Sequence, residues 1–166
     1  MKTQIKIPLV ITTCITPSPI SLGLNDPKLR LHYTLEGIHN WLLLDPNLEI
    51  IVCDGSNFDL TPTVRLHFPK SNIECLYFQG STAKVSEQGK GYGEGEILAY
   101  AISHSKLLQN SDSFMKCTGK LWAKNYKDCI NQWNKIFSAS AHFINIFNFK
   151  KPKVELIDTR FYITNK

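Results

Sequence analysis

The sequence lacks the patterns that mark several large classes of protein. No segment approaches the roughly 18 consecutive apolar residues of a membrane span. The five cysteines are an odd number, are scattered and never form CxxC, which argues against a disulfide framework and a zinc site and indicates a reducing compartment. The start, "MKTQIKIPLVITTCITPSP", has lysines before an apolar run but no small-residue cleavage pattern. It therefore predicts a first strand rather than a secretory signal.

Familiar nucleotide-binding and metal-binding motifs are also missing. The glycines at 91, 93 and 95 follow a polar stretch and have the wrong spacing for the G-x-G-x-x-G fingerprint. The segment "TGKL" at 118–121 fails as a P-loop because it has leucine where Ser or Thr is required. The chain contains no D-x-D triplet, and its five histidines lack metal-ligand spacing.

The bulk composition is that of an ordinary globular protein. The 166 residues are 43% hydrophobic and 20% charged, which predicts a single domain over residues 1–166. The net charge of +5 lies entirely in the second half, where thirteen Lys and Arg face seven Asp and Glu. Such a basic half suits an anionic partner, although solvated lysines that only maintain solubility explain it equally well.

The hydrophobic patterns predict alternating strands and helices. Strands are expected over 5–15, in the apolar run that ends at 53, over 72–80, near 113–118 and over 153–166, with a short helix or turn near 61–69. Asp26 and Pro27 predict the start of a long helix that ends at 45–47. A polar loop is expected at 80–90, and a further helix from about Glu94 to Gln109. The segment that begins at 126 is expected to be helical in its first part. Strand, helix and strand in this order imply a right-handed parallel unit and an α/β fold.

Two strand ends carry candidate binding residues. Asp54 follows a buried strand, where a carboxylate could accept hydrogen bonds from a ribose or a base, or could only form an Asx turn with Asn57. In "FMKCTGKLWAKN", alternation places Lys116, Thr118 and Lys120 on one side. These groups could neutralise a diphosphate leaving group, or could form the solvated face of a half-exposed strand.

A third candidate is Asp158, which interrupts the last apolar strand in "VELIDTRF". It could be a metal ligand or a catalytic carboxylate, but a structural pair with Arg160 is favoured by the pattern.

Together, "PLVITTCITPS", "LEIIVCDGSNFD", "KGYGEGEILAYAISHS" and "SFMKCTGKLWAKN" resemble a GT-A type nucleotide-sugar glycosyltransferase of the bacterial capsule or lipopolysaccharide branch. The resemblance implies a Rossmann-like three-layer α/β/α fold with a mainly parallel sheet. It also implies transfer of a sugar from a nucleotide-diphosphate sugar to a glycan or lipid-linked acceptor, in the cytoplasm or at the inner face of the membrane. No specific nucleic-acid partner is expected. The chain is shorter than such enzymes usually are, so we expect a donor-binding half, a C-terminally truncated product or a compact relative.

The resemblance also implies roles for particular residues. Glu94 and Asp158 are the candidate catalytic carboxylates. The expected nucleotide-sugar-binding residues are Thr12, Thr13, Arg30, Asp54, Ser56, Gly93, Glu94, Lys116, Thr118, Gly119 and Lys120. The glycine cluster at 91–95 is expected to be a flexible turn at the mouth of the donor cleft. Because D-x-D is absent, dependence on Mn²⁺ or Mg²⁺ does not carry over, and Lys116 and Lys120 are the expected substitutes, with Asp158 as a lone metal ligand the alternative.

Two other functions stay open on the sequence alone. The first is a non-catalytic α/β binding domain whose basic face meets an anionic partner. The second is a Rossmann-type methyltransferase, which is disfavoured because no glycine loop follows the first strand.

Overall fold

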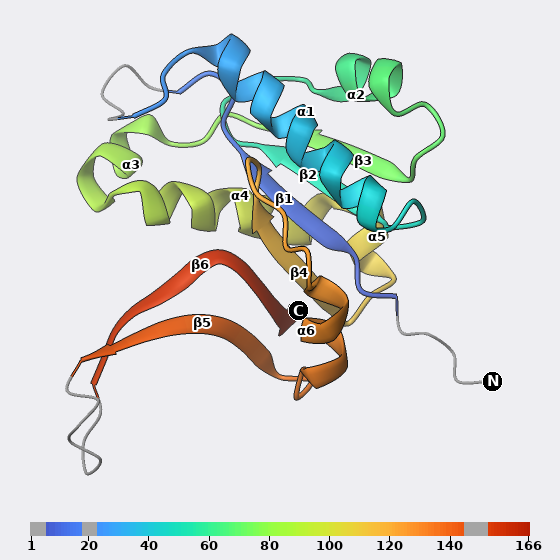
Figure 1. The fold of residues 1–166 in the computed structure, drawn as a ribbon. Helices are drawn as coiled ribbons and strands as arrows, with labels where there is room; N and C mark the ends of the chain where they lie inside the picture. Colours follow the sequence, from blue (N-terminus) through green and yellow to red (C-terminus); the bar gives the residue numbers. More distant parts are fainter. Residues whose placement is uncertain (1–5, 18–22, 145–152) are drawn as a thin grey trace.

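The computed structural model describes residues 6–17, 23–144 and 153–166, which form strands and helices in alternation (Figure 1). The strands are β1 (Leu9–Thr13), β2 (Ile50–Asp54), β3 (Ile73–Tyr77), β4 (Ser113–Thr118), β5 (Phe137–Ile144) and β6 (Lys153–Asn165). The helices are α1 (Pro27–Leu44), α2 (Thr61–His67), α3 (Thr82–Gln88), α4 (Lys90–His104), α5 (Lys106–Gln109) and α6 (Tyr126–Gln132).

The strands form one six-stranded sheet with the order β3-β2-β1-β4-β6-β5. Strands β3, β2, β1 and β4 are parallel. In the central strand β1, Val10 lies opposite Ile51 of β2 on one side and opposite Lys116 of β4 on the other. β6 pairs antiparallel with β4, and β5 pairs antiparallel with β6. Figure 1 shows this β5–β6 hairpin curving away from the rest of the sheet. The prediction of an α/β fold with a mainly parallel sheet is therefore confirmed.

Helices cover both faces of the sheet, because the parallel strands are buried on both sides. One core contains Ile11, Val52 and Met115 together with Trp41 of α1. The other contains Val10 and Ile51 together with Ile97 and Ala101 of α4. The alternation of side chains along each strand thus produces the expected three layers, helix, sheet and helix.

The N-terminal half follows the predictions closely. Helix α1 begins with Pro27, and the Asp26 side chain accepts a hydrogen bond from the Lys28 backbone N–H, as the capping pattern indicates. The segment at 61–69 forms the short helix α2.

Residues 80–109 depart from their prediction. The supposed polar loop at 80–90 contains α3, and the supposed helix from Glu94 begins four residues earlier, at Lys90. Ser105 then ends α4 and caps α5 by accepting a hydrogen bond from the Leu108 N–H. The glycine cluster is therefore helical, and its prediction as a flexible turn was wrong. Glycine lowers helix propensity, but contacts with neighbouring elements override that preference here.

Within the described part of the chain, none of the helices has the length and apolarity that crossing a bilayer requires.

Candidate functional site

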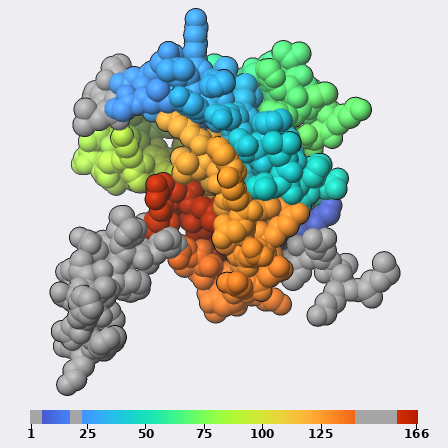
Figure 2. All heavy atoms as spheres, in the orientation of Figure 1, coloured from blue at the N-terminus to red at the C-terminus, as the bar shows by residue number. Residues whose placement is uncertain are grey.

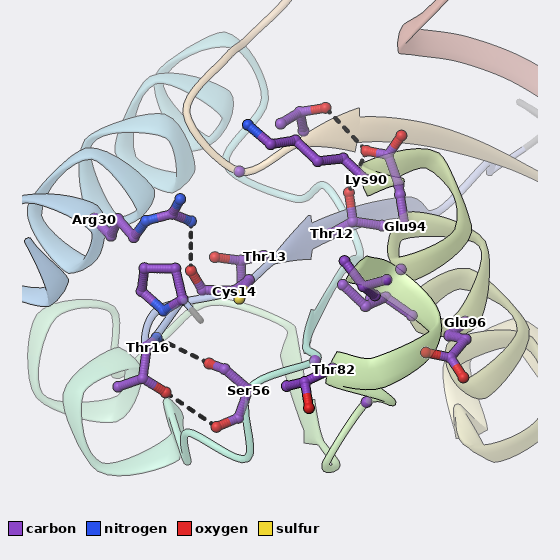
Figure 3. A pocket seen from close by; sticks show the side chains of 18 of the residues that line it. Thr12, Thr13, Cys14, Thr16, Arg30, Ser56, Thr82, Lys90, Glu94 and Glu96 are labelled. Atoms are coloured by element: carbon purple, nitrogen blue, oxygen red, sulfur yellow. Dashed lines mark hydrogen bonds between the residues drawn. The ribbon is translucent and has the colours of Figure 1, made fainter. Parts of the chain in front are cut away.

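A cleft with a volume of about 310 Å³ opens where the parallel strands end (Figures 2 and 3). Its floor comes from the carboxyl ends of β1, β2 and β4, including Thr13, Gly55 and Gly119. Its sides come from α1, α3 and α4, and the space-filling view shows these segments gathered around a hollow. β1 has β2 on one side and β4 on the other, so the cleft lies at the point where the strand order changes direction. Open α/β sheets bind their ligands at such points.

Asp54 lies beneath the cleft and does not line it. Its side chain is fully buried, and its oxygens accept hydrogen bonds from the backbone N–H groups of Ile15 (2.8 Å), Ser56 (2.7 Å) and Phe58 (3.1 Å). The Ser56 hydroxyl donates a further bond of 2.6 Å to the same carboxylate. The prediction that Asp54 faces a base or ribose is therefore corrected, because its acceptor capacity is used to join two loops.

Ser56 and Thr16 join the same two loops at the rim of the cleft (Figure 3). The Thr16 N–H donates to Ser56 Oγ over 2.9 Å, and the Thr16 hydroxyl donates to the Ser56 carbonyl over 3.1 Å. This loop-to-loop network gives the strand-end side of the cleft a defined shape.

Arg30 lines the cleft from α1 and holds the loop that follows β1 (Figure 3). Its Nε donates to the Leu24 carbonyl and its Nη1 to the Cys14 carbonyl, each over 2.7 Å. A guanidinium has five N–H donors, so these two bonds fix the plane of the group and leave further donors for a ligand. Arg30 was expected to bind the nucleotide sugar, and its position allows that role together with a structural one.

Lys116 and Glu94 form an ion pair behind the cleft. The Lys116 ammonium is almost completely buried, and it donates to Glu94 Oε1, to the Thr159 carbonyl (2.7 Å) and to Thr118 Oγ1 (3.3 Å). An ammonium has three donors, so the group is saturated by protein partners. Lys116 was predicted either to contact a diphosphate or to lie on the solvated face of a half-exposed strand. Both alternatives are corrected, because the side chain is internal and does not line the cleft.

Glu94 connects this ion pair to the cleft. Its side chain is 30% exposed and lines the cleft, while Oε1 also accepts hydrogen bonds from the Thr12 and Thr118 hydroxyls and Oε2 from the Thr159 hydroxyl. Burial, and to a smaller extent the charge of Glu94, raises the pKa of Tyr162 to about 12. Glu94 therefore holds β1, β4 and β6 against α4.

One face of α4 forms the opposite wall. Lys90, Gly93, Glu94 and Ile97 all line the cleft, and their spacing of three and four residues places them on one side of the helix. A Cβ on Gly93 would lie 2.8 Å from Cγ2 of Val85 in α3, so only glycine lets the two helices approach this closely. The glycine cluster thus serves helix packing at the cleft.

The segment after β4 brings Lys120 to the same cleft. This segment packs tightly on α1, because a Cβ added to Gly37 of α1 would lie only 2.7 Å from the carbonyl oxygen of Gly119. Burial lowers the pKa of Lys120, and the positive charges of Arg30 and Lys90 lower it further. Arg30, Lys90 and Lys120 therefore line one cleft, where the first two charges repel the third.

Asp158 has the structural role that the pattern favoured. It pairs with Arg160, whose Nη2 lies 2.5 Å from Asp158 Oδ2 and whose Nε lies 2.9 Å from Oδ1. The pair raises the pKa of the Arg160 guanidinium. Asp158 does not line the cleft, so this arrangement gives no support to a catalytic role.

The cleft gathers most of the residues that were predicted from separate parts of the sequence. Those that line it are Thr12, Thr13, Arg30, Ser56, Gly93, Glu94, Thr118, Gly119 and Lys120. Sequence reasoning missed Lys90, Gln79 and Thr82, all of which line the cleft. Lys90 could have been found by extending the helical period of α4 backwards from Ile97 and Glu94, but the glycines concealed that period.

Comparisons with known proteins do not assign a family. No model of a protein family matches the chain, and no curated protein matches its sequence. Among solved structures, HddC from Yersinia pseudotuberculosis superposes with a TM-score of 0.45 and 12% sequence identity, over 96% of this chain and 76% of that one. A likeness this distant carries no argument about function.

Proposed function

We propose that the protein is a glycosyltransferase, or the donor-binding part of one, and that its cleft binds a nucleotide-diphosphate sugar. The sugar would pass to a glycan or lipid-linked acceptor in the synthesis of a bacterial surface polysaccharide. The supporting observation is the convergence of Arg30, Lys90 and Lys120 on a cleft at the carboxyl ends of β1, β2 and β4.

The lining suits the parts of such a ligand. Its volume of about 310 Å³ is within the range of small-molecule sites. Hydroxyl groups of Thr12, Thr13, Thr16 and Ser56 surround the strand ends, where they match the hydroxyl groups of a ribose or a sugar. The cations match a diphosphate.

Glu94 is the carboxylate that this proposal places beside the sugar. Both of its oxygens already accept hydrogen bonds from protein groups, and one is paired with the Lys116 ammonium. Oε2 accepts only one of these bonds, from Thr159. We therefore assign Glu94 to orienting the donor by accepting hydrogen bonds from its hydroxyl groups at Oε2, and not to proton transfer.

Titration with UDP-, GDP-, CDP- and CMP-sugars tests the proposal. Thr82→Trp would fill the cleft from the first turn of α3, whereas Ala83→Trp places the same bulk on an exposed neighbour outside the lining. We expect binding of at least one nucleotide sugar and a loss of at least about tenfold in affinity for Thr82→Trp alone, which corresponds to about 1.4 kcal/mol. No binding of any of these sugars at millimolar concentration would defeat the proposal.

A further inference from the structure

We propose that the cleft neutralises the diphosphate of its ligand with three cationic side chains, Arg30, Lys90 and Lys120, and that this binding needs no divalent metal ion. The inference rests on the proposed function, because it concerns how the same cleft holds a nucleotide diphosphate. It also gives a role to Lys90, which the sequence motifs did not indicate.

The three cations come from separate elements and meet at one place. Arg30 belongs to α1, Lys90 is the first residue of α4, and Lys120 follows β4. All three line the same cleft, and burial, followed by the charges of Arg30 and Lys90, lowers the pKa of Lys120. Gathering like charges destabilises the folded protein, and a bound anion would relieve that repulsion.

Arg30 is already oriented for such a ligand. Its bonds to the Leu24 and Cys14 carbonyls use Nε and Nη1, so the planar group is held before any ligand arrives. A fixed guanidinium recognises phosphate oxygens with a smaller loss of side-chain entropy than a mobile lysine.

The carboxylates of the cleft do not fit a divalent cation. Mg²⁺ and Mn²⁺ favour carboxylate oxygens, but the buried Lys116 ammonium already neutralises the charge of Glu94, and Oε1 also accepts hydrogen bonds from Thr12 and Thr118. Glu96 Oε2 accepts a bond of 3.1 Å from the Ser81 N–H, which holds the start of α3. Over the described ranges, no three His, Cys, Asp or Glu side chains come together where they could hold a metal. The donor set of the cleft therefore suits an anion better than a metal.

The test compares the binding of UDP, GDP and CDP in EDTA with their binding in Mg²⁺ or Mn²⁺. The test variant is a double substitution that combines Lys90→Gln with Lys120→Gln. The control variant is Lys84→Gln. Lys84 lies on α3, is exposed and does not line the cleft, so its replacement removes positive charge without touching the site. Thermal unfolding of each variant checks that the fold is retained.

We expect at least one nucleoside diphosphate to bind with similar affinity in EDTA and with metal. The double variant should lose at least about tenfold in affinity, and Lys84→Gln should lose less than about twofold. Binding that requires the metal, or a double variant that binds as tightly as Lys84→Gln, would overturn this inference and leave the proposed function standing. Absence of nucleotide binding under both conditions would overturn the proposed function itself.

Discussion

The two walls of the cleft are held in different ways. The wall at the strand ends rests on buried polar groups, with Asp54 accepting four hydrogen bonds and Arg30 holding the loop after β1. The wall formed by α3 and α4 is less firmly anchored to the core, because none of the residues of α3 itself is buried. The strand-end wall therefore sets the position of a ligand, while the helical wall is the part that can adjust to it.

The largest effect is expected where the strand-end wall is broken. Asp54→Ala removes the acceptor of four buried or partly buried donors, so the free energy of unfolding should fall by about 3 kcal/mol or more. Urea unfolding measures this change. Asp112→Ala, at an exposed residue, should stay within about 0.5 kcal/mol of the wild type. Similar losses for the two variants would mean that the Asp54 network does not stabilise this wall.

The next effect concerns the ion pair that joins the two walls. Lys116→Met keeps a long apolar side chain but leaves Glu94 without its buried cation, which should cost about 2–3 kcal/mol, less than for a fully buried pair because Glu94 is 30% exposed. The double variant with Glu94→Gln should recover part of this loss, as a double-mutant cycle would show. Strictly additive effects would contradict a direct coupling between the walls.

A smaller change in stability is expected where α3 packs on α4. Gly93→Val places a side chain against Val85, which should cost about 1–2 kcal/mol because α3 can shift without exposing a core. Ligand affinity should fall by at least about tenfold, since the shift moves Thr82 and Val85 at the cleft. Calorimetric titration and urea unfolding of the same variant separate the two effects. A loss of stability with an affinity that stays within about twofold of the wild type would assign Gly93 to folding alone.

The smallest effect should be a gain in stability. Gly95 is exposed and has no atom within 4 Å of the position of a Cβ, so Gly95→Ala should stabilise α4 by about 0.5–1 kcal/mol. Ala99→Gly, at another exposed position of α4, should lose a similar amount. If Gly95→Ala destabilised the protein, the first turns of α4 would be under a constraint other than helix propensity.

The strand-end wall was largely predictable from the sequence because its signals are local. Apolar runs that end in polar residues marked β1 and β2, and Asp26 with Pro27 marked the start of α1. Parallel strands bring their carboxyl ends to one edge, which is why Thr13 and Ser56 lie at the same cleft.

The helix from Glu94 onwards was predicted, but α3 and the first turn of α4 were not, because long-range packing decides them. The three glycines disfavour a helix locally, and only the contact of Gly93 with Val85 explains why one of them must be there. Alternation along β4 correctly placed Lys116 and Thr118 on one side. It carried no information that Glu94, from a distant helix, would cover that side and bury the ammonium.

A crystal structure with the most tightly bound nucleoside diphosphate tests the central claim most directly. The account predicts that the diphosphate lies in the cleft within hydrogen-bonding distance of Arg30, Lys90 and Lys120, with the nucleoside along the ends of β1 and β2. A nucleotide bound elsewhere on the protein, or one whose phosphates avoid these three side chains, would contradict it.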